Sequence, residues 1–381
     1  MSEADRLSFS TDDWEKDSTH VEQLNGSGAN RNGATSTSTH LITGGAGFIG
    51  SHLADALCAR GDLVVILDDL STGRRENIVH LVEGGKAVFI EGSVLDSELV
   101  DTWVQRVDNC FHLASAVGVR LVVDNPLESL LRNVRGTNVV AHAAARYGKR
   151  LLFTSTSEVY GKHSNGALRE DADCLLGPSS KSRWGYANTK AFGEMLAFGY
   201  ARERGADTAV VRLFNSVGPR QLGSYGMVLP RFVAQALEGE DLTVYGDGSQ
   251  SRCFTHVYDT VDGILAVADS EEAVGEVFNV GASTEIPIEE LAERVIERTG
   301  SSSHIRHVPY QEAYGEGFEE LGRRKPDTSA IEGLCGWRPR RTIDDAIDDL
   351  ATQLRGRTPE GWVSSPAMLN GGLKEAAEFS A

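Results

Sequence analysis

Cysteine, basic residues and long apolar runs are all scarce in this chain of 381 residues. The five cysteines are scattered, odd in number and without the close spacing of metal ligands: Cys58, Cys110, Cys174, Cys253 and Cys335. We therefore expect free thiols in a reducing cytoplasm, no disulfide framework and no metal site.

Membrane and nucleic-acid signals are also missing. No run of about 18 apolar residues occurs, which argues against a membrane-spanning helix. The first residues lack the basic and then apolar regions of a signal peptide. The chain has 37 Lys and Arg against 55 Asp and Glu, which gives a formal net charge of −18. Because such a chain repels other polyanions, we expect no nucleic-acid partner and no acidic membrane partner.

Apolar periodicity is absent at both ends of the chain. Residues 1–38 are rich in Ser, Thr, Asn, Asp and Gly and cannot bury enough surface to offset the entropy of ordering, so they predict a disordered leader. Residues 356–381 predict a tail. The length suits one large domain or two modest ones. We place a dinucleotide-binding domain at 39–215 and a substrate-binding domain, interleaved with the first, at 216–355.

A repeated alternation of strand and helix fills the first of these domains. Its predicted strands are 40–43, 63–67, 86–90, 110–114, 151–156 and 208–214, and its main helices are 51–60, 127–147 and 186–204. Repeated strand and helix units of this length imply an α/β fold with a doubly wound parallel sheet and right-handed crossovers.

A glycine-rich turn follows the first predicted strand. Gly44, Gly47 and Gly50 allow a tight turn and a close backbone approach to a pyrophosphate, whose charge is favoured by the following helix N-terminus. Asp68 ends the next strand, where a carboxylate accepts hydrogen bonds from ribose hydroxyls and repels a 2′-phosphate. Arg74-Arg75 lie close enough to admit that phosphate, but Asp68 comes directly at the strand end. The pattern therefore favours NAD over NADP.

Chemistry is predicted at the end of the fifth strand, where an apolar run breaks into Thr156, Ser157 and Glu158. Ligands in parallel sheets bind outside the carboxyl ends of the strands. Downstream, Tyr186 and Lys190 are four residues apart and share one helix face. An ammonium there would lower the pKa of the phenol, which could then take a proton from a sugar hydroxyl while hydride leaves the carbon. Thr156 would hold the same hydroxyl in line.

These motifs together carry a family resemblance over residues 40 to about 355. They are TGGAGFIG from Thr43, STSEVYG from Ser155, YANTK from Tyr186, RLFNSVGPRQ from Arg212, GDGSQSRCFTHV from Gly246 and RRKPD from Arg323. The chain resembles the extended short-chain dehydrogenase/reductases that act as NAD-dependent nucleotide-sugar epimerases, dehydratases and decarboxylases. The resemblance implies a Rossmann-type sheet with a smaller α/β substrate-binding domain, a retained NAD, a UDP-sugar bound across both domains, and a homodimer through helices 127–147 and 186–204.

The resemblance also implies the roles of individual residues. Cofactor contacts fall on Gly44, Gly47, Phe48, Ile49, Asp68, Val94, Leu113, Tyr186 and Lys190. Substrate contacts fall on Ser157, Asn215, Arg231, Tyr245, Gln250, Arg252 and Arg324. Catalytic roles fall on Thr156, Glu158, Tyr186, Lys190 and Arg252.

Glu158 and Arg252 favour one reaction within the family. Both resemble the UDP-glucuronic acid decarboxylase branch, as does the segment Tyr314–Gly317. Oxidation at C4 gives a β-keto acid that loses CO2, and re-reduction then gives a UDP-pentose, UDP-xylose, unless the 4-keto sugar is released. Arg252 would orient the carboxylate or stabilise the enolate, and Glu158 or a water that it holds would handle the C5 proton.

Other interpretations stay open. A 4-epimerase acting on UDP-glucuronate or UDP-glucose would return hydride to the other face without losing carbon. A 4,6-dehydratase needs a second acid, but Ser157 stands where some dehydratases have an aspartate. A noncatalytic NAD(H) sensor on the same fold would not need Thr156, Tyr186 and Lys190. Two alternatives concern single residues: Glu158 could be solvated at the rim of the site, and Arg252 could bind phosphate. The segment Lys181–Gly185 departs from the usual decarboxylase pattern, and Ser93 replaces a frequent adenine-contacting aspartate.

Overall fold

The structure is a computed structural model that describes residues 37–117, 126–163, 166–223, 227–309, 312 and 324–356. The predicted leader lies outside these ranges except for residues 37–38, and the predicted tail lies outside them except for residue 356. Arg323 and the segment Tyr314–Gly317, which entered the sequence argument, also lie outside the described residues.

A seven-stranded parallel sheet forms the centre of the larger part of the molecule. Its order is β11-β6-β5-β4-β1-β2-β3, and every neighbouring pair is parallel. The strands are β1 (Thr39–Thr43), β2 (Leu63–Asp68), β3 (Ala87–Glu91), β4 (Asn109–His112), β5 (Arg150–Thr156), β6 (Thr208–Leu213) and β11 (Val277–Val280). The predicted Rossmann-type, doubly wound parallel sheet is confirmed.

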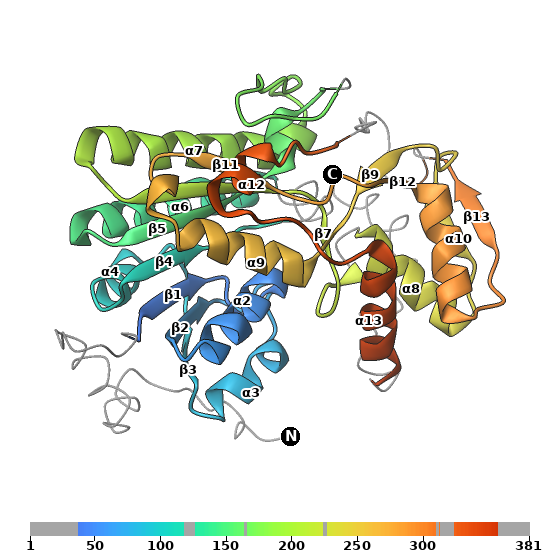
Figure 1. Cartoon of the computed structure of the whole chain (residues 1–381), viewed down its shortest axis with the longest axis horizontal. Helices are drawn as coiled ribbons and strands as arrows, with labels where there is room; N and C mark the ends of the chain where they lie inside the picture. The colour runs from blue at the N-terminus through green and yellow to red at the C-terminus, as the bar shows by residue number, and fades with distance from the viewer. Residues whose placement is uncertain are drawn as a thin grey trace, which may run out of the picture.

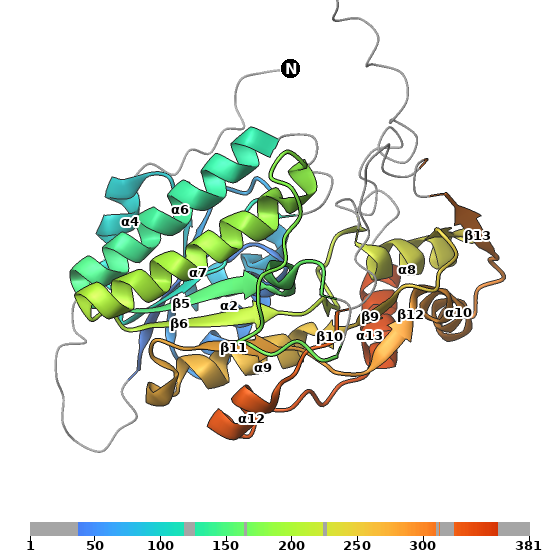
Figure 2. The same ribbon diagram turned by 90° about the horizontal axis from the view of Figure 1, so that it is seen from above.

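Helices cover both faces of this sheet, which is why its central strands are apolar on both sides. One face carries α4 (Ser97–Val104), α6 (Pro126–Tyr147) and α7 (Gly185–Arg204), and Figure 2 shows α6 and α7 lying side by side. The other face carries α2 (Phe48–Ala59), α3 (Val79–Val82), α9 (Val257–Ala268) and α12 (Ser329–Cys335). Short 3-10 turns are η2 (Arg75–Asn77), η3 (Ser157–Tyr160), η4 (Ser182–Trp184) and η6 (Glu271–Ala273).

The strand order reverses between β1 and β4. From β1 the chain moves outward through β2 and β3, whereas β4, β5 and β6 follow one another in the opposite direction. In open α/β sheets the crevice outside such a reversal binds ligands. The ends of β1, β4 and β5 therefore mark where a site is expected.

A second core lies beside the sheet, on the right in Figure 1. It packs α8 (Val228–Glu238), α10 (Ile288–Thr299) and α13 (Ile343–Arg355) around buried residues such as Phe232, Leu291 and Leu350. Its short strands pair as β8 (Leu242–Tyr245) with β13 (Ile305–Val308), and β9 (Ser251–Cys253) with β12 (Glu285–Pro287). The pair β7 (Ser216–Val217) and β10 (Thr255–His256) joins it to the end of β6.

Segments after residue 215 also contribute to the large sheet and its helices. Strand β11 pairs with β6 at the sheet edge, and α9 and α12 pack on the same side as α2. The predicted division at 215 stays a prediction, with the second half of the chain contributing to both cores.

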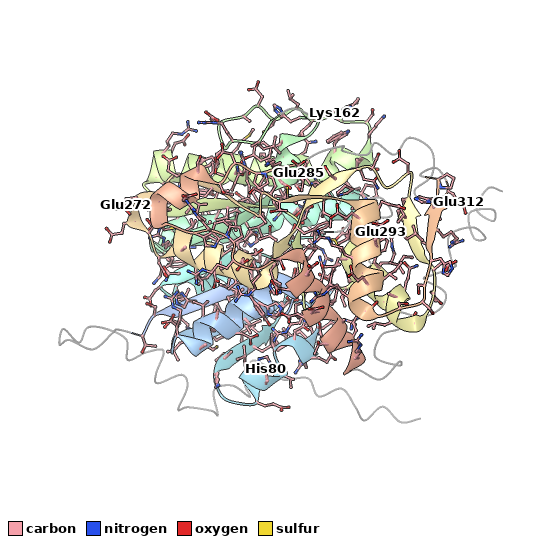
Figure 3. The ribbon with its side chains drawn as sticks, turned by 45° about the vertical axis from the view of Figure 1, so that its right-hand side comes forward. His80, Lys162, Glu272, Glu285, Glu293 and Glu312 are labelled. Atoms are coloured by element: carbon pink, nitrogen blue, oxygen red, sulfur yellow. The ribbon has the colours of Figure 1, made fainter. Side chains whose placement is uncertain are left out.

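Acidic side chains are prominent on the surface. Figure 3 shows Glu272 and Glu312 pointing outward from opposite ends of the molecule, and both are exposed.

None of the helices in the described ranges combines the length and apolarity that crossing a bilayer needs.

Candidate active site

The glycine turn joins β1 to α2 as the sequence predicted. Gly44 has a φ of +73°, and a Cβ there would come within 2.7 Å of the Ala114 backbone nitrogen. A Cβ on Gly50 would lie 2.2 Å from the Gly44 carbonyl oxygen. Side chains are thus excluded where the turn, the helix start and the end of β4 meet. No side chain of the described residues caps the start of helix α2, and its first turn holds no acidic residue, so its first N–H groups are open to an anion.

Asp68 holds this turn in shape. Its carboxylate accepts hydrogen bonds from the Ala46 nitrogen at 2.9 Å and the Leu70 nitrogen at 2.9 Å, and the side chain is buried. Burial raises the pKa of Asp68, and the backbone hydrogen bonds oppose that shift. Asp68 also lines the central cavity, where a ribose would meet it. Its predicted ribose contact stays a prediction.

The hydroxyl-rich end of β5 faces α7. Thr156 caps η3 by accepting a hydrogen bond of 3.3 Å from the Glu158 nitrogen. Lys190 is buried and donates from Nζ to the Thr154 carbonyl oxygen at 2.9 Å. Burial lowers the pKa of Lys190 to about 7, with Glu194 acting in the opposite direction.

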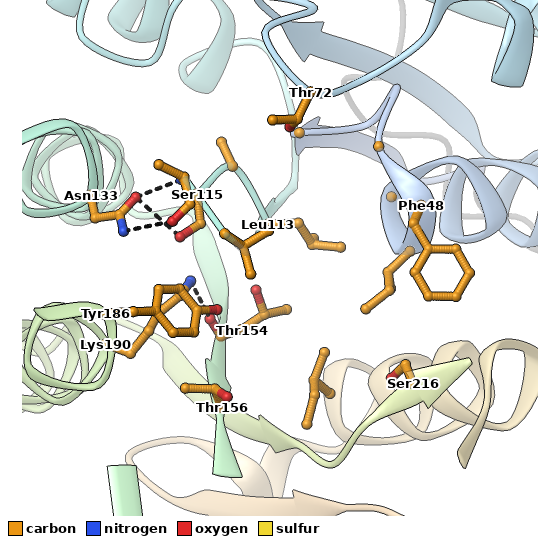
Figure 4. A pocket seen from close by; sticks show the side chains of 18 of the residues that line it. Phe48, Thr72, Leu113, Ser115, Asn133, Thr154, Thr156, Tyr186, Lys190 and Ser216 are labelled. Carbon is orange, nitrogen blue, oxygen red and sulfur yellow. Dashed lines mark hydrogen bonds between the residues drawn. The ribbon is translucent and has the colours of Figure 1, made fainter. Parts of the chain in front are cut away.

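Tyr186 points from α7 toward the same cavity. Figure 4 shows it beside Lys190, with Phe48 on the opposite side of the space between them. The Lys190 ammonium lies 5.9 Å from the centre of the Tyr186 ring. The Ser115 side chain hydrogen-bonds the phenol, and Ser115 in turn donates to Asn133 Oδ1 at 3.1 Å. Tyr186 and Lys190 thus lie together as their spacing predicted.

One electrostatic expectation about this pair is wrong for the protein alone. The four-residue spacing predicts that Lys190 lowers the pKa of Tyr186. Instead, burial raises the pKa of Tyr186, the charge of Glu158 raises it further, and the Ser115 hydrogen bond offsets only part. The physical reason is that burial removes the water that would stabilise a phenolate, while the same burial weakens the charge on Lys190.

Glu158 lies among arginines. Arg183 Nη1 donates to its Oε2 at 2.7 Å, and Arg324 Nη1 lies 3.8 Å from Oε1. Burial by itself raises the pKa of Glu158, but the charges of Arg183 and Arg324, with a smaller contribution from Arg252, outweigh it and hold the pKa below its ordinary value. Glu158 is therefore a carboxylate at neutral pH. In that form it accepts hydrogen bonds and has no proton to donate.

Most predicted site residues line one central cavity of about 350 Å³. They are Gly44, Gly47, Phe48, Ile49, Asp68, Val94, Leu113, Thr156, Ser157, Glu158, Tyr186, Lys190, Asn215 and Arg324. The open start of α2, the turn without side chains and Asp68 fit a dinucleotide at one end of this cavity. The hydroxyls and Glu158 are left at the other end.

Four predicted substrate residues do not line this cavity. Arg252 is buried and donates to the Ser251 carbonyl oxygen at 2.7 Å, yet it is close enough to Glu158 to favour its ionised form. Arg231 lies 4.2 Å from the centre of the Tyr245 ring, and Gln250 donates to the Tyr245 carbonyl oxygen at 3.1 Å. These last three form a separate cluster beside β8, and their substrate contacts stay predictions.

Two residues that the sequence argument gave no role belong to the site. Asn133 on α6 accepts from the Ala116 nitrogen at 2.7 Å and donates to the Ala116 carbonyl oxygen at 3.1 Å, which fixes the loop after β4 (Figure 4). Its sequence signal was a polar residue on the buried face of a long helix. Arg183 had a stronger signal, because it lies in the segment that departs from the decarboxylase pattern.

Comparisons with known proteins agree with this geometry. Residues 40–281 match the model of the NAD dependent epimerase/dehydratase family. The chain is 43% identical over 310 residues to the UDP-N-acetyl-alpha-D-glucosaminuronate decarboxylase of Bacillus cytotoxicus, covering 81% of this chain and 95% of that protein. It is 35% identical to UDP-glucuronic acid decarboxylase 1 of Arabidopsis thaliana, covering 83% and 70%.

A solved structure shares the fold. The dTDP-glucose 4,6-dehydratase of Streptomyces venezuelae, with NAD bound, superposes with a TM-score of 0.76 at 30% identity, covering 86% of this chain and 99% of that one. The predicted cofactor, NAD, agrees with the matched family. On its sequence, its fold and its catalytic cleft, the chain belongs to the NAD dependent epimerase/dehydratase family.

Proposed function

We propose that this chain is an NAD-dependent decarboxylase of a UDP-linked uronic acid, with UDP-glucuronic acid as substrate. The observation that carries the proposal is the charge around Glu158. Arg183, Arg324 and, more weakly, Arg252 all act on this one carboxylate, so several guanidinium groups converge at this end of the cavity. A uronate carboxylate would be attracted by these guanidinium groups, whereas the hydroxymethyl group of a neutral hexose would not.

Oxidation at C4 would use the residues of β5 and α7. Tyr186 takes the proton of the C4 hydroxyl, and Thr156 orients that hydroxyl. Lys190 fixes the end of β5 through the Thr154 carbonyl oxygen. NAD⁺, when bound, would supply the acceptor for the hydride that leaves C4, and its positive ring charge would favour the phenolate that burial disfavours.

Loss of CO2 would use the arginine end of the cavity. The β-keto acid releases CO2 and leaves negative charge on the enolate oxygen, which the guanidinium of Arg324 or Arg252 stabilises. Glu158 is ionised, so it accepts a hydrogen bond from a water and orients it toward C5, which takes up a proton supplied by solvent through that water. Return of hydride to C4, together with return of the proton from Tyr186 to the C4 oxygen, then gives a UDP-pentose.

A second substrate of the same class is favoured by one comparison. The relative at 43% identity is named for UDP-N-acetylglucosaminuronate, which differs from UDP-glucuronate at C2. Because the chemistry at C4, C5 and C6 is common to both sugars, the charge argument supports either one. The alternative reaction, 4-epimerisation, would retain the uronate carboxylate. A 4,6-dehydratase would need a second acid, but this chain has Ser157 at the position where some dehydratases have an aspartate.

Substrate anchoring would come from both cores. Asn215, at the end of β6, donates to the Cys253 carbonyl oxygen at 2.9 Å and so links the two cores beside the cavity. The cluster of Arg231, Tyr245 and Gln250 offers a cation and an aromatic face for the UDP portion, which would reach from there to the sugar pocket.

A homodimer is part of the proposal. Leu127 and Leu131 on α6, and Phe192 and Met195 on α7, are large apolar side chains with 37–68% of their surface exposed. Each pair has helical spacing of three or four residues and so lies on one face. A second copy would cover this apolar surface. None of the five cysteines, all within the described residues, forms a disulfide, which supports a reducing location such as the cytoplasm.

The deciding experiment offers the holoenzyme UDP-glucuronate, its 2-acetamido counterpart and UDP-glucose in parallel. Labelled CO2 is collected, and products are identified by mass spectrometry and NMR. We expect CO2 from at least one uronate and none from UDP-glucose. Glu158→Ala and Arg252→Ala should slow CO2 release more than they weaken NAD binding. An isomeric product of unchanged mass from every substrate would refute the decarboxylase.

A further inference from the structure

Arg183 lies in the short turn η4 just before the catalytic helix, within the segment that departs from the usual decarboxylase pattern. Its neighbour Trp184 is buried and anchors the turn, because the Trp184 nitrogen bonds back to the Lys181 carbonyl oxygen at 3.1 Å. With Trp184 fixed in the core, the adjacent side chain is directed to Glu158. Only 12% of the Arg183 side chain is exposed, so this ion pair is largely shielded from water.

The two arginines that hold Glu158 lie on different sides of its carboxylate. Arg183 bonds Oε2 and Arg324 faces Oε1, so each oxygen has its own guanidinium. Glu158 and Arg324 line the central cavity, whereas Arg183 does not. Among the described residues, Arg183 is therefore connected to the cavity lining through its ion pair with Glu158.

The Arg183–Glu158 pair is also incomplete as a structural salt bridge. The Nε of Arg183 is buried and has no hydrogen-bond partner among the described residues. An unpaired buried donor costs about 1–3 kcal/mol, and an isolated pair of this kind is weak evidence for a stabilising role. This free-energy cost is consistent with a role of Arg183 in the function of Glu158 rather than in stability.

We propose that Arg183 is a positioning residue that fixes Glu158 at the cavity wall as an ionised, hydrogen-bond-accepting carboxylate. This inference rests on the proposed decarboxylation, and it concerns how Glu158 is kept in the form that orients a water over C5. A neutral Glu158 would carry an O–H group that donates to the water oxygen, which reverses the orientation of that water.

The groups facing Glu158 set the sign of the expected pH effect. They are Arg183 from η4, Arg324 from the last described segment, Arg252 from β9 and the phenol of Tyr186 from α7. Burial raises the pKa of Glu158, and Arg183 is the largest influence against it. Without Arg183 the pKa rises, so the ionised form is lost at a higher pH as acid is added. The acid limb of the pH–rate profile must therefore move to higher pH.

The test compares Arg183→Met with the wild-type holoenzyme over a range of pH. We expect the acid limb in the pH profile of CO2 release to move to higher pH by about one pH unit. At pH values below that limb the rate should fall by about tenfold, and on the alkaline side it should stay near that of the wild type. Arg183→Lys should recover most of the shift. Arg202→Met, an exposed arginine on α7, is the matched control and should leave the profile unchanged.

A double variant separates positioning from folding. In a Glu158→Gln background there is no carboxylate to ionise, so adding Arg183→Met should produce no further pH shift. A parallel loss of rate at every pH in Arg183→Met, or an equal shift in both backgrounds, would overturn the inference. If Arg183→Met does not fold, Arg183→Gln, which removes the charge but keeps a polar side chain, is compared in the wild-type and Glu158→Gln backgrounds instead. Absence of CO2 from both uronates with the wild type would instead remove the proposed function itself.

Discussion

The side-chain oxygen of Asn279 accepts a hydrogen bond of 2.7 Å from the hydroxyl of Tyr160. Tyr160 ends the turn that carries Glu158. The Asn279 amide also donates at 3.0 Å to the carbonyl oxygen of Asp327, three residues after Arg324. One fully buried amide on the edge strand β11 therefore ties together the two segments whose Glu158 and Arg324 face each other in the cavity.

Asn279→Ala should weaken both the fold and the reaction. The side chain makes three hydrogen bonds, and the partners of two of them are buried, so we expect the free energy of unfolding to fall by about 3 kcal/mol. CO2 release should fall as well, because Glu158 and Arg324 lose their common tether. Urea denaturation and the rate are measured beside Asn109→Ala, which removes a single bond to His40. Equal losses in the two variants would contradict this account.

The parts of the molecule that could be predicted are those whose signals are local. The glycine turn, the apolar strand ending in hydroxyls and the four-residue spacing of Tyr186 and Lys190 each need fewer than a dozen residues to be recognised. The sheet topology then follows from strand and helix alternation. The fold and the family were predictable for this reason.

The remaining features depend on contacts between distant segments. Strand β11 is only four residues long and joins the sheet beside β6, although over 60 residues separate them. The pairing of Arg183 with Glu158 requires η4 to return to the end of β5. In the protein without its cofactor, the pKa of Tyr186 is shifted in the opposite direction to the prediction, because spacing reveals a neighbouring lysine but not the burial of both groups.

Gly50→Ala should disrupt the cofactor turn. The new methyl group would lie 2.2 Å from the Gly44 carbonyl oxygen, a backbone atom that cannot move aside, so we expect a loss of about 2 kcal/mol or more and weaker NAD binding. Gly333→Ala is the control, since its methyl group meets nothing within 4 Å in α12 and should stabilise by about 0.5–1 kcal/mol. Unchanged NAD affinity in Gly50→Ala would refute the assigned turn.

Tyr186→Phe should remove the base for C4 oxidation. The ring and its packing are kept, so NAD binding and the melting temperature should change little. Turnover should fall by about 10²- to 10⁴-fold, as expected for loss of a general base. Single-turnover NADH fluorescence reports the oxidation step directly. Tyr200→Phe, on the same helix, serves as control, and full activity in Tyr186→Phe would show that another group takes the proton.

Met195→Glu should separate the proposed dimer. Met195 is 68% exposed and lies beside Phe192 on α7, so a charge there would be buried without a partner in a two-copy interface. Sedimentation should show a monomer for this variant and a dimer for the wild type. Val274→Glu changes an exposed apolar residue away from α6 and α7 and should remain dimeric. A wild-type monomer would refute the interface.

Lys190→Met should change how stability depends on pH in protein freed of nucleotide. The pKa of Lys190 is lowered by burial from 10.5 to about 7, so between those values the unfolded chain binds a proton that the folded chain does not. Unfolding is then favoured by acid, and the wild type gains stability as pH rises through this window. The methionine variant lacks that gain, so any stability advantage it has near pH 7 must shrink toward pH 10. Lys86→Met, at an exposed lysine, should run parallel to the wild type in urea denaturation at each pH. A Lys190→Met curve that also runs parallel would mean that Lys190 keeps its proton in the folded protein, and the hydrogen bond to Thr154 would then come from an ammonium.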